Sequence, residues 1–137
     1  MFKRWATLTL AWLLAQGTAL ADGILVIAHA GVPKTDLATL QRIYTGKVIE
    51  INTLGVVPLN APPGHPTRTR FLRDFLHQDE EKYTGYWTVR RYIGKGTPPQ
   101  EVASPAEMIA AVQSTPGAIG YIHDSDWKPG LNVLFRQ

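Results

Sequence analysis

Residues 56–71 read Val-Val-Pro-Leu-Asn-Ala-Pro-Pro-Gly-His-Pro-Thr-Arg-Thr-Arg-Phe, and this stretch decides the fold. The apolar run at 56–59 has the length of a short strand, and the prolines and glycine after it predict a tight loop. Apolar residues then recur at helical spacing from Phe71 onward, which predicts a helix over residues 67–78. A strand, a loop and a helix in this order are typical of an α/β fold.

The junction between this loop and this helix has the parts of an anion site. The first N–H groups of a helix have no partner within the helix, and the helix dipole places partial positive charge there. Gly64 allows the backbone to approach a ligand closely, and Thr67 adds a hydroxyl group. Arg68 and Arg70 add positive charge that can pair with an oxyanion. The same residues are also typical of a plain turn capped by Thr67 with arginines on a solvated helix face, and the residues alone leave both interpretations open.

The first 21 residues have the pattern of a secretory signal peptide. Lys3 and Arg4 form a short basic start, residues 6–15 are mostly apolar, and Ala19-Leu20-Ala21 matches a small-x-small cleavage site. The apolar run is too short for a membrane span. We therefore expect residues 22–137 to form one exported domain, soluble in the periplasm.

Charge and cysteine content exclude several classes of function. Lys3 and Arg4 are two of the 14 basic residues, and the 11 acidic residues leave the processed chain close to neutral. A nucleic-acid partner therefore has little support. The chain has no cysteine, which excludes disulfides, thiol catalysis and a lipid anchor on cysteine.

The remaining segments alternate between strand and helix patterns. Residues 24–28, 118–122 and 132–135 are predicted strands, and residues 47–59 hold one or two short strands. Helices are predicted after Thr35 or Asp36 and after Ser104, which is followed by Pro and Glu in a capping pattern. Another helix is predicted to start at Asp79-Glu80-Glu81, with these acids in its first turn. This order predicts one α/β domain with a mixed sheet flanked by helices.

Motifs for catalysis and metal binding are lacking. The four histidines (His29, His65, His77 and His123) show no metal-ligand spacing, and no nucleophile elbow, Walker loop or dinucleotide fingerprint occurs. We expect no cofactor and no enzyme activity.

An aromatic set lies in the helix after Asp79: Tyr83, Tyr86, Trp87 and Tyr92. Such residues are more often core packing than a binding surface. With Arg90, Arg91 and Lys95 beside them, they also suit a protein interface.

Three segments carry a resemblance to a known family. Residues 40–47 read Leu-Gln-Arg-Ile-Tyr-Thr-Gly-Lys, residues 63–71 read Pro-Gly-His-Pro-Thr-Arg-Thr-Arg-Phe, and residues 116–122 read Pro-Gly-Ala-Ile-Gly-Tyr-Ile. In this order they resemble one lobe of the type II periplasmic binding proteins, above all the phosphate-binding subunits of ABC transporters and their shorter relatives. The resemblance implies a single lobe of a periplasmic-binding-protein-like fold.

The resemblance also implies a ligand site at Gly64, His65, Thr67 and Arg68. Two departures limit it. His65 and Pro66 stand where the family has Ser and Gly, so one hydroxyl and one N–H donor are missing, and the chain has room for only one lobe. An open half-site implies millimolar affinity, about −4 kcal/mol.

The resulting expectation is a periplasmic solute-binding-like protein that binds phosphate or a related oxyanion weakly. The alternative is an interaction module that has lost the ligand and binds a membrane sensor, an ABC transporter or a second copy of itself. In that case the surface around residues 64–68, with part of the helix at 83–92, is the expected binding face, and a homodimer is its simplest form.

Overall fold

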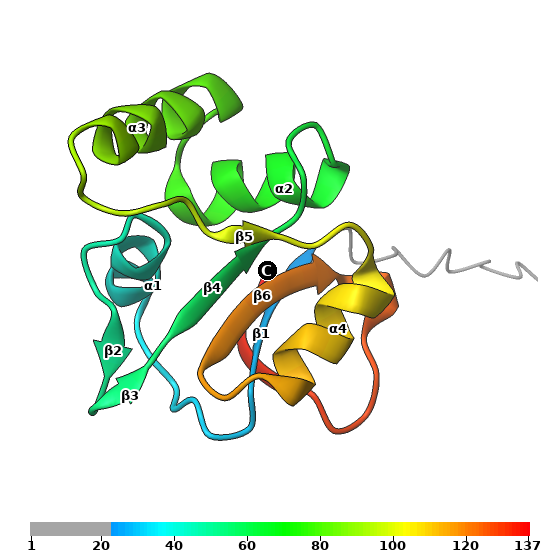
Figure 1. The fold of residues 1–137 in the computed structure, drawn as a ribbon. Helices are drawn as coiled ribbons and strands as arrows, with labels where there is room; N and C mark the ends of the chain where they lie inside the picture. Colours follow the sequence, from blue (N-terminus) through cyan, green and yellow to red (C-terminus); the bar gives the residue numbers. More distant parts are fainter. Residues whose placement is uncertain (1–22) are drawn as a thin grey trace, which may run out of the picture.

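The computed structural model describes residues 23–137, and the predicted signal peptide lies outside the described residues. Their centre is a five-stranded mixed sheet in the order β5-β4-β6-β1-β7 (Figure 1). Strands β5, β4 and β6 run parallel, whereas β1 is antiparallel to both of its neighbours. The strands are β1 (Ile24–Ala28), β4 (Val57–Asn60), β5 (Gln100–Glu101), β6 (Ala118–His123) and β7 (Asn132–Arg136). A hairpin of β2 (Glu50–Ile51) and β3 (Leu54–Gly55) forms a second sheet.

Helices cover both faces of the main sheet, with α1 and α2 on one side and α4 on the other (Figure 1). Alternate residues of β1 divide between these two layers: Ile24 and Val26 pack toward α1 and α2, and Leu25 and Ile27 pack toward α4. The prediction of a mixed sheet flanked by helices is therefore confirmed. The helices are α1 (Leu37–Tyr44), α2 (Pro66–Phe71), the π-helix η1 (Leu72–Leu76), α3 (Glu80–Tyr92), α4 (Pro105–Ser114) and the 3₁₀ turn η2 (Asp124–Asp126).

Stacked aromatic rings fix α2 on the sheet. The ring of Phe71 stacks on that of Tyr121 with centroids 4.0 Å apart, and the ring of Tyr44 lies 4.7 Å from that of Phe71. The hydroxyl of Tyr44 donates to the carbonyl of Leu59 at 2.8 Å, which satisfies its buried polar end. Burial raises the pKa of both Tyr44 and Tyr121, because a phenolate loses its hydration there.

Two glycines of the segment 116–122 allow close packing. Gly117 has φ of +78°, and a Cβ on it would lie 1.9 Å from the carbonyl oxygen of Gly55. A Cβ on Gly120 would lie 2.5 Å from the sulfur of Met108, so α4 approaches β6 closely at this position. The motif is therefore a packing requirement of this fold.

The predicted helix over residues 67–78 is confirmed over residues 67–76, and its second half is π-helical rather than α-helical. The α-helical part begins at Pro66 and ends at Phe71, and one π-helical segment, η1, follows. His77, with φ of +54°, then ends the helix and turns the chain toward α3. Apolar spacing does not distinguish a π turn from an α turn, so this change cannot be predicted from the sequence pattern.

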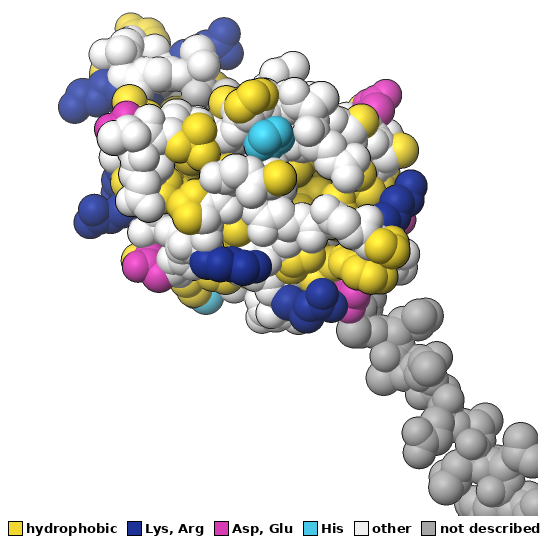
Figure 2. Space-filling model, turned by 90° about the horizontal axis from the view of Figure 1, so that it is seen from below, with side chains coloured by type: hydrophobic (Ala, Val, Ile, Leu, Met, Phe, Trp, Pro, Cys, Tyr) yellow, Lys and Arg dark blue, Asp and Glu magenta, His cyan; other side chains and the backbone are white. Residues whose placement is uncertain are grey.

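The helix starts agree with the sequence at three places. Asp36, and not Thr35, caps α1 by accepting from the N–H of Thr39 at 2.7 Å, and Asp79 and Ser104 cap α3 and α4. No helix within residues 23–137 is long and apolar enough to cross a membrane. The underside of the molecule shows small apolar patches among scattered side chains of both charges (Figure 2).

Candidate functional site

The start of α2 is closed by a histidine. His65 is the N-cap residue, and its Nδ1 accepts from the N–H of Thr67 at 3.2 Å and lies 2.8 Å from the Thr67 hydroxyl. Pro66 follows at the first helical position, where its missing N–H costs no hydrogen bond. The interpretation of Thr67 as the cap is therefore wrong, because the histidine before the proline takes that role.

The start of α4 lies beside the start of α2. The hydroxyl of Ser104 accepts from the N–H of Glu107 at 3.1 Å and caps α4. A shallow pocket of about 10 Å³ is lined by His65 and Thr67 from one helix start and by Ser104 and Pro105 from the other. This is about the room that one water molecule needs. Two helix N-termini, each with partial positive charge, therefore meet at one point.

This junction lies at the carboxyl ends of the parallel strands. The same pocket is bordered by Ala61 after β4, by Val102 after β5 and by Tyr121 and Ile122 at the end of β6. In open α/β sheets, ligands bind outside the carboxyl ends of the strands. The location is thus the expected one for a ligand of this fold class.

Gly64 leaves the approach to the junction open. It is exposed, has φ of +83°, and a Cβ on it would meet no atom within 4 Å. The turn needs glycine for its backbone conformation, since few other residues adopt positive φ. The described structure gives no neighbour that requires a bare backbone there.

Arg68 points away from this junction into the protein. Its side chain is 6% exposed, and its guanidinium donates to both carboxylate oxygens of Glu80, at 2.8 and 3.0 Å. It also donates to the carbonyl of Ala61 at 3.1 Å, and a carboxylate oxygen of Glu101 lies 3.7 Å away. The positive charge of Arg68 is therefore balanced within the chain, and two bonds to one carboxylate fix its orientation.

Arg68 instead borders a larger pocket of about 210 Å³. Its walls come from the end of β4, from α3 and from the segment before β5: Asn60, Pro63, Arg68, Tyr83, Thr84, Trp87, Thr88, Arg91, Pro98, Pro99 and Glu101. Two arginines and one acid therefore line this pocket. The four predicted ligand residues do not form one cluster, because His65 and Thr67 line one pocket and Arg68 lines another.

A buried hydrogen-bond chain that the sequence did not indicate supports both pockets. Tyr121 donates to Oδ1 of Asn60, and Nδ2 of Asn60 donates to the hydroxyl of Tyr83, each at 3.0 Å. Tyr83 in turn donates to the carbonyl of Tyr44, and burial raises its pKa. In the sequence, the one indication of this hydrogen-bond chain is Asn60, a polar residue at the end of a buried strand.

The other candidates separate into core and surface. Tyr83 and Trp87 are buried, Tyr86 is half-buried, and Tyr92 is 92% exposed. Arg90 lies over the rings of Tyr86 and Trp87, so its charge faces the protein. Within residues 23–137, no group of three His, Asp or Glu side chains is placed to hold a metal ion.

Comparison with known proteins finds no matching family model and no match among curated proteins. Solved structures of similar fold include two phosphate-transport proteins. One is an ABC-type phosphate transport receptor from Vibrio cholerae, with 15% identity and a TM-score of 0.58 over 82% of this chain and 45% of the receptor. The other, from Clostridium perfringens, is described as a phosphate ABC transporter substrate-binding protein with bound phosphate. It has 24% identity and a TM-score of 0.60 over 82% of this chain and 44% of its own.

These similarities concern the fold. The chain spans less than half the length of each neighbour. The residues thus form part of a periplasmic-binding-protein-like fold, as the resemblance implied.

Proposed function

We propose that this chain is an exported solute-binding-like protein that binds phosphate or a related oxyanion weakly, where α2 and α4 begin. The observation that carries the proposal is the shared pocket of His65, Thr67 and Ser104, formed by two helix starts at the carboxyl ends of the parallel strands. Both fold neighbours are phosphate-binding transport proteins by their descriptions, which supports this class of ligand.

The junction can attract a small anion although no Lys or Arg side chain lines its pocket. The two helix dipoles attract negative charge. The hydroxyl of Ser104 can donate to a ligand oxygen, and so can that of Thr67 once it turns away from Nδ1 of His65. The pocket holds little more than a water molecule, so a tetrahedral oxyanion rests at its mouth, in contact with solvent. Water competes there, so the expected affinity is about millimolar.

A second function is favoured by the ion pair of Arg68. Its guanidinium already binds Glu80, so this chain has no buried arginine reserved for a ligand among the residues of the predicted site. A lobe of this kind can serve as an interaction module for a membrane sensor or the membrane part of an ABC transporter. In that case phosphate has no specific effect on the protein.

A titration of the processed protein, purified from an exporting host, separates the two. Phosphate, sulfate and chloride are added at equal ionic strength while backbone amide shifts are followed. The proposal predicts saturable phosphate shifts at residues 64–69 and 104–107. Equal shifts with chloride, or shifts spread over the whole surface, would contradict it.

A matched pair of variants tests the residues. Thr67→Val keeps the side-chain shape and removes the hydroxyl, so phosphate binding is expected to weaken by about threefold to tenfold. Thr69→Val makes the same change on the exposed side of α2 and is expected to leave binding unchanged. Equal effects of the two variants would rule out a site at the helix start.

A further inference from the structure

Helix α3 has two apolar faces, and the described structure covers one of them. Tyr83 and Trp87 pack inward. On the opposite side, at helical spacing, lie Gly85, Val89 and Tyr92, and Val89 is 60% and Tyr92 92% exposed. Residues 85, 89 and 92, together with the 57% exposed Ile93, form what we call the outer stripe of α3.

Gly85 in the middle of this stripe has no internal explanation. A Cβ at this position would meet no atom within 4 Å, so the fold itself has room for alanine. Glycine within a helix costs stability relative to alanine. Its remaining structural effect is to let a second helix approach the backbone closely at the centre of the stripe.

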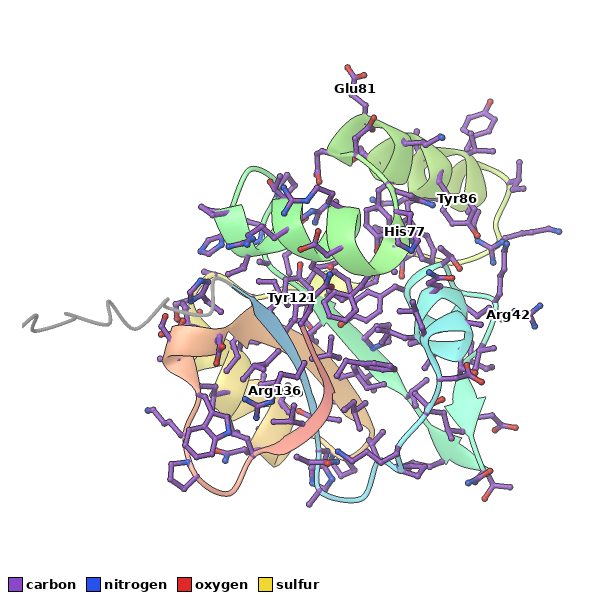
Figure 3. All side chains as sticks on the ribbon, turned by 180° about the vertical axis from the view of Figure 1, so that it is seen from behind. Arg42, His77, Glu81, Tyr86, Tyr121 and Arg136 are labelled. Atoms are coloured by element: carbon purple, nitrogen blue, oxygen red, sulfur yellow. The ribbon has the colours of Figure 1, made fainter. Side chains whose placement is uncertain are left out.

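Charges along α3 favour one orientation of that second helix. Glu81 stands in the first turn and points away from the body of the molecule (Figure 3). Arg91 stands in the last turn, on the same flank of the stripe by helical spacing, and Lys95 follows the helix. In an antiparallel pair of α3 helices, Arg91 of each copy lies beside Glu81 of the other, so the ion pair forms twice.

The open edges of the sheet are less suited to a second copy. Strand β5 has only two residues, and on the other edge the ammonium group of Lys34 donates to the carbonyl of Val133 in β7. Lysine at a sheet edge hinders strand addition.

We propose that α3 pairs with α3 of a second copy of this chain, antiparallel, about a two-fold axis between Gly85 and Val89. Val89 of each copy packs on Gly85 of the other, and Tyr92 of each copy lies over Lys82 of the other. A helix of 13 residues is about 20 Å long, which gives a small interface and a weak, concentration-dependent dimer. The proposed dimer is independent of oxyanion binding where α2 and α4 begin, since no residue of α3 lines that pocket, although Thr88 and Arg91 also line the larger pocket.

Sedimentation of the processed protein from about 1 µM to 1 mM tests the association. We expect a monomer–dimer equilibrium that Val89→Glu abolishes, because two like charges meet near the axis. Ile49→Glu is the matched control: Ile49 is also an exposed apolar residue, outside α3, and its change is expected to leave the dimer intact. A monomer at every concentration would overturn the proposal, as would equal effects of the two variants.

A charge exchange tests the orientation. Glu81→Arg and Arg91→Glu should each weaken the dimer by about tenfold, and the double variant should restore it. Because the chain has no cysteine, a single Thr88→Cys near the axis should give a disulfide-linked dimer on oxidation, whereas Ile49→Cys should not. Additive loss in the double variant, or equal cross-linking at both positions, would contradict the antiparallel arrangement.

Discussion

Arg68 stabilises the fold through contacts within the chain and is not free to bind a ligand. Its guanidinium joins α2 to the first turn of α3 through Glu80 and to the loop after β4 through the carbonyl of Ala61. The ring of Tyr83 lies 5.4 Å from its central carbon. A cation that is bound on three sides holds the loop before α2 in place and fixes where the helix begins.

Replacing Arg68 should therefore reduce stability first. Arg68→Ala leaves the carboxylate of Glu80 and the carbonyl of Ala61 without their donor, and we expect a loss of about 2–4 kcal/mol in the free energy of unfolding. The control is Arg73→Ala, whose pair with Asp74 lies on the surface and should contribute less than about 1 kcal/mol. Urea unfolding measures the free energy of unfolding of both variants. Similar small losses in the two would show that the ion pair of Arg68 does not stabilise the fold.

Gly117 permits a contact that no other residue allows. Gly117→Ala places a Cβ against the carbonyl of Gly55 and also requires positive φ, so we expect a loss of more than about 3 kcal/mol. Gly130 also has a positive φ but open space around it, so Gly130→Ala should cost about 1–2 kcal/mol. The difference between the urea midpoints of the two variants measures the effect of the contact between position 117 and the carbonyl of Gly55. Equal losses would show that this contact does not limit the side chain at position 117.

For the helices and strands, the sequence predicts most strands and helix starts, but it does not predict how neighbouring elements contact one another. Ser104 is identifiable as a cap because serine is preferred at that position, whereas the acids at residues 79–81 indicate only that a helix starts there. His65 was missed because histidine is not among the preferred caps, and β5 because two residues carry no pattern. The pair of Arg68 with Glu80 depends on the turn at His77, which no local pattern encodes.

The cap of α1 should make stability depend on acid pH. Hydrogen bonds from Thr39 lower the pKa of Asp36, because they favour its charged form. A lowered pKa means that this stabilisation is present above the pKa of the unfolded chain and is lost as pH falls through the folded value. Asp36→Asn keeps a capping side chain without a titrating group, so urea unfolding between about pH 5 and pH 2 should show a weaker pH dependence. An unchanged slope would contradict this assignment.

In the whole molecule, a single α/β domain brings the starts of α2 and α4 together. The motif at residues 116–122 and the loop before α2 indicated the fold from sequence, and the structure adds the junction with α4. This junction was not predicted, because α2 and α4 begin almost 40 residues apart and meet only through the order of β4, β5 and β6. A ligand held from one side stays in contact with solvent, which is the physical reason for weak binding.

The proposed oxyanion site lies where α2 and α4 begin. The most direct test is a crystal structure of the processed protein soaked in tungstate, a tetrahedral oxyanion whose anomalous scattering locates it. We expect a peak at the mouth of the pocket between His65, Thr67 and Ser104, and we expect phosphate to displace it. A peak beside Arg91 in the larger pocket, or none near either helix start at millimolar tungstate, would contradict it.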